Sequence, residues 1–183
     1  WDQKESMPYI MSDDRILRPA NFPPGTGGKG AGLFQSKNGV SVGVVCIQGR
    51  TNMRPLDCPF RMGEEIVEDL RKETPVIVVD FHAEATSEKI AYGWFLDGKV
   101  SAVLGTHTHV QTADERILPD GTAYISDVGM TGPHDSVIGA QKEPAIRRFV
   151  DQMPVRFEPA SGDIKLCGIL LKVDPESGKA TGI

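Results

Sequence analysis

Apolar residues recur along the chain in two spacings, which predict a mixture of strands and helices. Nearly continuous apolar runs are typical of buried strands, and they lie at 33–36, 40–47, 76–79, 100–104 and 122–125. Helical spacing of apolar residues predicts helices over about 62–72, 85–96 and 144–150. Alternating apolar positions predict one more strand over 164–170.

The order strand, helix, strand over 76–104 predicts a βαβ unit with parallel strands. Its helix should turn four residues inward, namely Ile90, Ala91, Trp94 and Phe95. The dipeptide Asn38-Gly39 between the first two strands indicates a hairpin turn. The predicted class is α/β, with more strand than helix near both ends.

Composition narrows the classes of function without choosing one. The 183 residues suffice for a single domain with its own core. With 20 Lys and Arg against 25 Asp and Glu, the net charge of −5 argues against a protein that coats nucleic acid. No apolar run approaches the ~20 residues that cross a bilayer, so no membrane role is expected. Three widely spaced cysteines without a C-x-x-C pair favour a reduced, cytoplasmic setting.

Three of the four histidines follow the two apolar strands of the βαβ unit. His82 comes after the run at 76–79, and His107 and His109 come after the run at 100–104. Because the carboxyl ends of neighbouring parallel strands meet at one edge of a sheet, these side chains should lie together. If the second strand continues, the two-residue spacing puts His107 and His109 on one face. Three imidazoles suit a metal such as Zn, Mn or Fe.

Other polar positions are interpreted more simply. His134 lies alone in a loop and is expected at the surface. The glycine run at 25–30 contains G-x-G-x-x-G, but a strand and not a helix follows it, so we interpret it as a turn. Thr131 and Arg50 are candidate phosphate contacts, for which a turn hydrogen bond and a surface ion pair are the simpler interpretations.

Long motifs surround the candidate histidines, at 80–89, 105–114 and 127–133, with shorter ones at 18–23 and 48–51. They resemble motifs of the bacterial YmdB-like phosphodiesterases, in the calcineurin-like metallophosphoesterase superfamily. The resemblance runs nearly end to end. It implies a calcineurin-like α/β sandwich, in which two β-sheets are flanked by helices.

The resemblance also implies an activity, the hydrolysis of 2′,3′-cyclic and 3′,5′-cyclic nucleotides or related phosphodiesters. Two divalent ions, of Mn, Fe or Zn, would hold a bridging hydroxide for in-line attack on phosphorus. By position in the motifs, His82 and His107 would bind one ion and His109 the other. Asp80 and Glu84 would orient the ligand imidazoles or contact the substrate.

The chain also departs from the family pattern. Trp1-Asp2 resembles the end of the third of three early motifs, so the resemblance implies that an Asp, a Glu and an Asn ligand and the general-acid His precede Trp1. No catalytic residue is therefore expected within the chain, which we predict to be an N-terminally incomplete domain with little activity alone. The strand edge left unpaired would favour a homo-oligomer.

Two alternative functions stay open. The stretch from His107 to Gln111 also resembles the H-x-H-x-Q of histidine-triad nucleotidyl hydrolases and transferases, in which an imidazole is the nucleophile. Thr108 is polar where that motif is apolar, and His82 would have no role. The other alternative is a non-catalytic fragment or interaction module. Activity that survives removal of metal would exclude the phosphodiesterase interpretation.

Overall fold

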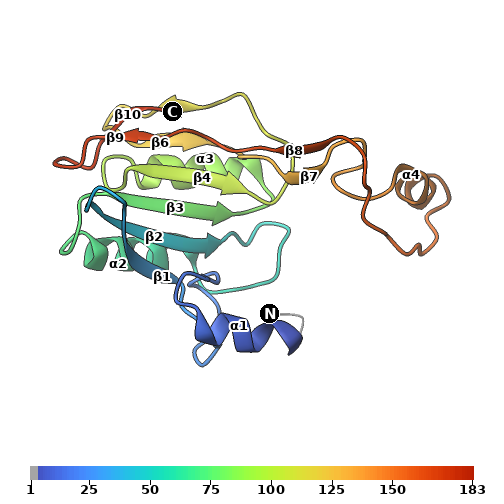
Figure 1. The fold of residues 1–183 in the computed structure, drawn as a ribbon, viewed down its shortest axis with the longest axis horizontal. Helices are drawn as coiled ribbons and strands as arrows, with labels where there is room; N and C mark the ends of the chain where they lie inside the picture. The colour runs from blue at the N-terminus through green and yellow to red at the C-terminus, as the bar shows by residue number, and fades with distance from the viewer. Residues whose placement is uncertain (1–3) are drawn as a thin grey trace.

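A six-stranded mixed sheet forms the centre of the structure, a computed structural model that describes residues 4–183 (Figure 1). Trp1-Asp2, and with it the predicted match to a family motif, lies outside the described residues. In chain order the elements are η1 (Lys4–Ser6), α1 (Met7–Ser12), β1 (Ala31–Gln35), β2 (Ser41–Gln48), α2 (Pro59–Leu70), β3 (Ile77–His82), α3 (Thr86–Phe95), β4 (Ala102–Thr106), β5 (Arg116–Ile117), β6 (Ala123–Ile125), β7 (Thr131–Pro133), α4 (Lys142–Asp151), β8 (Ile164–Leu166), β9 (Lys172–Val173) and β10 (Ala180–Gly182).

The sheet has the strand order β1-β2-β3-β4-β6-β5. The four inner strands are parallel, and β1 and β5 pair antiparallel at the two edges. The unit β3–α3–β4 is the predicted βαβ unit, and the hairpin β1–β2 turns at the predicted Asn38-Gly39, where Gly39 has φ +83°. The glycine run at 25–30 leads directly into β1, so no helix follows it, as predicted.

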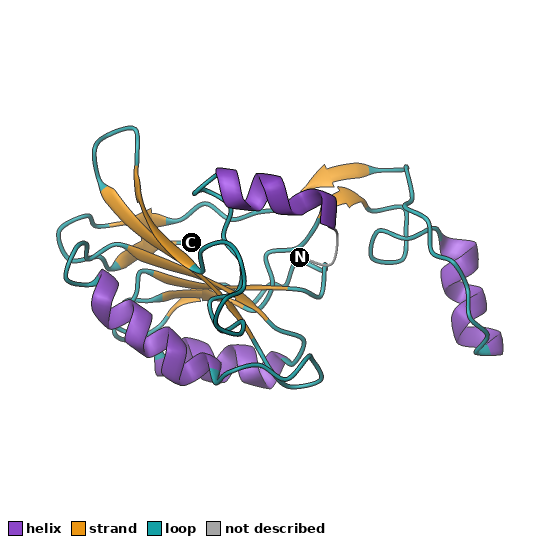
Figure 2. Cartoon of the chain, turned by 90° about the horizontal axis from the view of Figure 1, so that it is seen from below, coloured by secondary structure: helices purple, strands orange, loops and turns teal. Residues whose placement is uncertain are grey.

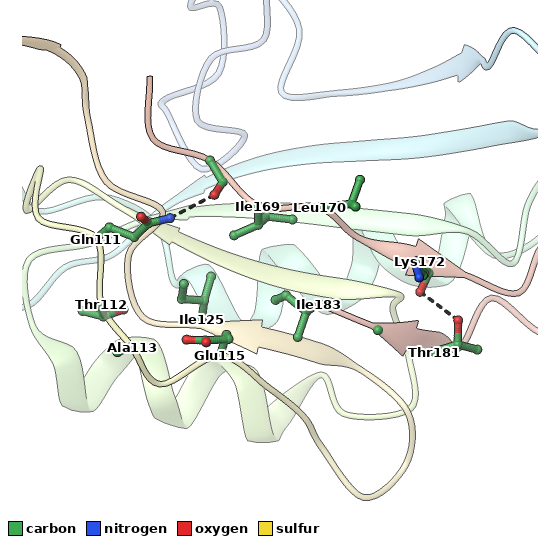
Figure 3. Close-up of a pocket in the computed structure, with 12 residues that line it drawn as sticks. Gln111, Thr112, Ala113, Glu115, Ile125, Ile169, Leu170, Lys172, Thr181 and Ile183 are labelled. Atoms are coloured by element: carbon green, nitrogen blue, oxygen red, sulfur yellow. Dashed lines mark hydrogen bonds between the residues drawn. The ribbon is translucent and has the colours of Figure 1, made fainter. Parts of the chain in front are cut away.

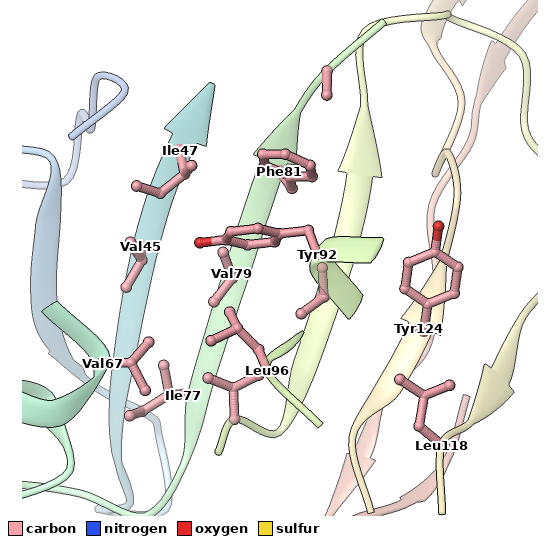
Figure 4. Packing of buried hydrophobic residues seen from close by; sticks show 13 residues of the cluster. Val45, Ile47, Val67, Ile77, Val79, Phe81, Tyr92, Leu96, Leu118 and Tyr124 are labelled. Carbon is pink, nitrogen blue, oxygen red and sulfur yellow. The ribbon is translucent and has the colours of Figure 1, made fainter. Parts of the chain in front are cut away.

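The main hydrophobic core lies between the sheet and helices α2 and α3, which cover the same face of the sheet (Figures 1 and 2). The rings of Phe81 and Tyr92 stack with centroids 4.1 Å apart. Val67 of α2 and Leu96 at the end of α3 are buried beside them (Figure 4). Fully burying such a side chain contributes about 1.5–3 kcal/mol, and these contacts fix the two helices on the sheet.

The predicted inward face of α3 is correct for Ile90 and Phe95, which pack against the core, and wrong for Ala91 and Trp94. Ala91 is exposed and Trp94 is 50% exposed, whereas Tyr92 and Leu96 are buried. The buried face also contains Lys89, a residue type that is almost never fully buried without a partner. Because one residue turns a helix by about 100°, an inward Lys89 places Tyr92 and Leu96 on the buried face and leaves Ala91 and Trp94 in solvent.

Residues 131–166 form an arm that projects from one end of the sheet. Its β7 and β8 pair antiparallel, and α4 lies beyond them, away from the core (Figures 1 and 2). Phe149 and Val150 of α4 are 74% and 79% exposed. The predicted strand over 164–170 is shorter, because β8 ends at Leu166 where its pairing with β7 ends.

The described residues contain two smaller sheets besides the central one, β7–β8 and β9–β10, each of two strands. The class is therefore α/β, as predicted, and the two-sheet sandwich stays a prediction. Within residues 4–183, no helix has the length and apolar character required to span a bilayer.

Candidate metal centre

His82 and His107 meet at the carboxyl edge of the sheet, as their positions after neighbouring strands predict. His82 is the last residue of β3, and His107 directly follows β4. Nε2 of His82 lies 3.0 Å from Nδ1 of His107, and the two rings are nearly perpendicular. Gly105 permits the approach of strands here, because a Cβ at this position would overlap the carbonyl oxygen of Ser126.

A hydrogen-bonded relay fixes the tautomer of His82. The hydroxyl of Thr106 donates to Asp80 Oδ1 at 2.7 Å, so the oxygen of this hydroxyl accepts from His82 Nδ1 at 3.1 Å. The proton of His82 therefore lies on Nδ1, and the lone pair of Nε2 faces His107. This is how metal-binding histidines are commonly oriented. Asp80 thus connects to His82 through Thr106, a residue that the sequence did not indicate, and its orienting role stays a prediction.

Burial sets the charge states in this relay. Loss of solvent, followed by repulsion from His107, lowers the pKa of His82 below 6.5 and favours the neutral, metal-binding form. Burial raises the pKa of Asp80 above 3.8, against the hydrogen bond from Thr106, which lowers it. The Sγ of Cys46 also lies 3.8 Å from Asp80 Oδ2, within the same group of side chains.

Glu84 approaches the pair from the far side of His107. Its Oε2 lies 3.1 Å from His107 Nε2 and half of its side chain is exposed. A pocket of about 670 Å³ opens beside His82, His107 and Asp80. Gln48, Asn52, Arg54 and Phe22 are among its other lining residues.

His109 does not share a face with His107, contrary to the extended conformation considered above. The strand β4 ends at Thr106, and His107 and His109 have φ values of +107° and +67°. These dihedrals turn the chain, so His109 lies at a second pocket, of about 560 Å³, that does not include His82. His109 Nδ1 donates to the carbonyl oxygen of Ile138 at 2.8 Å, so Nε2 is the ring nitrogen that remains available to a ligand.

The second pocket also contains His134 and Cys167. His134 Nδ1 lies 3.1 Å from the carbonyl oxygen of Gly132, and its Nε2 lies 3.5 Å from the thiol of Cys167. His134 is half-buried, so the expected surface position is only partly correct. Thr131 is exposed at the start of β7 and is not among the lining residues of either pocket.

A third pocket, of about 560 Å³, lies between β6 and the C-terminal segment (Figure 3). Ile125 and Ile183 lie in its wall, and Gln111 Nε2 donates to the carbonyl oxygen of Gly168 at 2.9 Å across one end. No histidine or cysteine lines it. The chemistry of this pocket is therefore less specific than that of the first two.

The turn between His107 and His109 is held by residues that sequence reasoning did not assign to the site. Thr108 donates to the buried carboxylate of Asp127, which also accepts from Lys89. Burial alone would raise the pKa of Asp127, but hydrogen bonds from Thr108 and Lys89 outweigh it and hold this pKa below 3.8. Both Lys89 and Asp127 lie within motifs quoted above, yet nothing in the sequence shows that they pair.

The side chains at this site supply part of the ligand set that a divalent ion requires. Imidazole nitrogens bind such ions at about 2.0–2.1 Å, so two ligands of one ion lie at most about 4 Å apart. The 3.0 Å between His82 and His107 satisfies this limit. Among residues 4–183, however, no three His, Cys, Asp or Glu side chains form a group that would hold a metal. The pair is therefore compatible with an ion that has further ligands.

The fold and this pair define an α/β protein with a histidine-lined pocket at the carboxyl ends of parallel strands, where α/β proteins bind ligands. The chain belongs to the YmdB-like protein family, whose model matches residues 1–183. It is 52% identical, over all of its 183 residues and 69% of the relative, to a 2′,3′-cyclic-nucleotide 2′-phosphodiesterase of Bacillus subtilis (strain 168).

Two solved structures have the same fold. A novel phosphatase from Mycoplasma pneumoniae has a TM-score of 0.89 and 35% identity, and the match covers 98% of this chain and 66% of that one. A hypothetical protein from Thermus thermophilus has a TM-score of 0.83 and 46% identity, over 88% of this chain and 63% of that one. The chain thus spans about two thirds of the length of these relatives, whose named members are phosphodiesterases or phosphatases.

Proposed function

We propose that this protein is a metal-dependent phosphodiesterase that hydrolyses cyclic nucleotides, with 2′,3′-cyclic monophosphates as the leading substrates and 3′,5′-cyclic ones as further candidates. The observation that carries the proposal is the facing pair of His82 and His107, whose nitrogens lie 3.0 Å apart beside a pocket of about 670 Å³. The 52% identity to the Bacillus subtilis enzyme supports the substrate class.

The chain's own residues would hold one divalent ion through His82 and His107, and His109 would contribute to a second. An ion bound there would supply Lewis-acid stabilisation of the phosphoryl oxygens and would lower the pKa of a water. Asp80 acts through Thr106 to keep the Nε2 of His82 unprotonated. Glu84 orients His107 from the opposite side.

The pocket beside the histidine pair is suited to a nucleotide. Its volume of about 670 Å³ lies within the usual range of small-molecule sites. Arg54 in its wall is a cation for a phosphate, and Phe22 is an aromatic surface for a base. Thr131, a candidate substrate contact from the sequence, is exposed on β7 and does not line this pocket.

The donor set within residues 4–183 does not complete a two-metal centre. The proposal therefore requires further ligands and a general acid, which the family resemblance places in segments outside the present sequence. We accordingly expect this chain alone to bind metal weakly and to turn over substrate slowly.

A homo-oligomer is a related proposal, supported by the exposed Phe149 and Val150 of the arm, and size-exclusion chromatography tests it.

The test is hydrolysis of bis-p-nitrophenyl phosphate and of a 2′,3′-cyclic nucleotide with Mn²⁺. The 183-residue chain is compared with a version extended upstream. His82→Ala in the extended version should abolish activity, whereas His134→Ala is the matched histidine control and should retain most of it. Full turnover after thorough metal removal would exclude this function and favour the histidine-triad alternative.

A further inference from the structure

A buried ion pair joins α3 to the segment that follows β6, and the proposed chemistry above does not use it. Lys89 Nζ donates to Asp127 Oδ2 at 2.9 Å, and the two side chains are only 3% and 1% exposed. Removing two charges from water is costly, and replacing such pairs by apolar residues is often neutral or stabilising. Stability of the fold alone is therefore a weak reason for this pair.

The carboxylate of Asp127 also binds the turn that carries two candidate ligands. Its Oδ2 accepts from Thr108 N at 2.9 Å and from Thr108 Oγ1 at 2.7 Å, while its Oδ1 accepts from Gly129 N at 2.9 Å. Thr108 lies between His107 and His109. One carboxylate thus connects the helix α3, the chain after β6 and the histidine turn after β4.

This turn needs an external support. His107 and His109 both have positive φ, at +107° and +67°, a conformation that is unfavourable for residues with a Cβ. Strained backbone of this kind persists where the surroundings over-determine it, and such positions cluster at functional sites. The two hydrogen bonds from Thr108 to Asp127 tie down the residue at the middle of the strained segment.

We propose that the Lys89–Asp127 pair is a positioning device, which binds Thr108 and thereby holds His107 and His109 in the orientation in which they bind metal. None of the three residues lines the pocket beside His82 and His107 or the pocket at His109, and they act only through the histidines. The inference deepens the proposed function and rests on it for the metal. The orientation of the two imidazoles can be measured without any metal.

The experiment uses Thr108→Val, which removes the side-chain hydrogen bond to Asp127 and leaves the buried ion pair in place. Thr108→Ser restores the hydroxyl. The control is Thr122→Val, since the hydroxyl of Thr122, like that of Thr108, donates to an acceptor distant in sequence, Val100 O at 2.7 Å, and Thr122 lies at the opposite end of β6 from Asp127. Lys89→Met tests whether the positive charge of Lys89 is required to position the histidines. If the Lys89→Met variant does not fold, Thr108→Val alone tests the proposal.

Three quantities are measured on the 183-residue chain, namely Zn²⁺ affinity by competition with a chromophoric chelator, the histidine side-chain NMR signals of the metal-free chain, and the unfolding temperature. Thr108→Val should lower Zn²⁺ affinity about tenfold, within the range known for residues that orient ligands. It should also shift the signals of His107 and His109 but not of His134. Thr108→Ser should restore Zn²⁺ affinity to within about twofold of wild type. It should also return the histidine signals to their wild-type positions.

Thr122→Val should lower the unfolding temperature and leave Zn²⁺ affinity and the histidine signals unchanged. The inference is overturned if Thr108→Val affects only the unfolding temperature, or if Thr122→Val shifts the same histidine signals. Absence of Zn²⁺ binding by the wild-type chain would count against its metal site. In that case the histidine signals still decide whether the ion pair positions the turn.

Discussion

The carboxyl edge of the sheet and the arm of residues 131–166 place polar and apolar groups in opposite ways. At the edge, the charged side chains of Lys89 and Asp127 are almost completely buried. In the arm, the apolar side chains of Phe149 and Val150 are mostly exposed. The edge buries groups that are costly to desolvate, and the arm exposes groups that would gain from burial. Both are unfavourable for the isolated fold, which indicates that each region is arranged for something other than stability.

The largest expected difference between the two regions is in stability. Asp127→Asn leaves the ammonium of Lys89 buried without a charged partner and should cost about 3–5 kcal/mol. Phe149→Ser in the arm should change stability by less than about 0.5 kcal/mol, because the side chain is already in solvent. Urea unfolding measures both. Equal losses of unfolding free energy in the two variants would contradict the proposed difference between the sheet edge and the arm.

The same pair predicts a pH dependence. The pKa of Asp127 in the folded chain lies below its ordinary value of 3.8. Its contribution to stability is therefore complete above that value and is lost as the pH falls through the lowered pKa, where the carboxylate takes up a proton. Asp127→Asn should have a flatter stability profile than wild type over this acidic range, measured by urea unfolding at a series of pH values.

The next effect concerns metal affinity at the two histidine pockets. His82→Ala should weaken Mn²⁺ or Zn²⁺ binding at least about tenfold, since it removes one of the two facing nitrogens. His134→Ala, which changes the pocket beside the arm, should leave affinity within about twofold of wild type. Calorimetric titration of both variants gives the comparison. A larger loss from His134→Ala than from His82→Ala would contradict the assignment of the ion to the His82–His107 pair.

A smaller effect is expected in the core below the edge. The hydroxyl of Tyr92 is buried and has no hydrogen-bond partner among the described residues. Tyr92→Phe retains the stacking on Phe81 and removes the unpaired group, so it should stabilise the chain by about 1 kcal/mol. Thermal unfolding tests this, and a destabilised variant would mean that the hydroxyl has a partner in solution.

Cysteine reactivity extends the comparison to a third place, the start of α2. Burial, followed by repulsion from Asp80, raises the pKa of Cys46 at the sheet edge to about 12. The backbone N–H of Arg61 and other groups at the start of α2 lower the pKa of Cys58 below 9.0. At about pH 8, iodoacetamide should modify Cys58 at least about tenfold faster than Cys46. Mass spectrometry of timed digests measures the two rates. Equal rates would contradict the conclusion that burial at the sheet edge protects the thiol of Cys46.

The parts of the fold that were predictable are those in which nearby residues decide the structure. The Asn38-Gly39 turn and the apolar run before His82 determine the hairpin and the strand β3, and the run before His107 determines β4. From these strands the meeting of His82 and His107 follows, because parallel strands align their ends.

The predictions that failed depend on partners distant in sequence. Ala91 and Trp94 of α3 were wrongly placed inward because Lys89 turns toward Asp127, 38 residues later. His107 and His109 do not share a face because the same carboxylate holds Thr108 in a strained turn. A lysine in an amphipathic helix is ordinarily placed in solvent, and only the folded chain shows the buried carboxylate that it binds.

The most direct test of the central claim is hydrolysis of a 2′,3′-cyclic nucleotide by the upstream-extended protein, before and after metal removal and after return of Mn²⁺. We predict activity that is lost with the metal, restored by Mn²⁺, and absent in His82→Ala under every condition. Activity that persists without metal, or that His82→Ala retains in full, would contradict it.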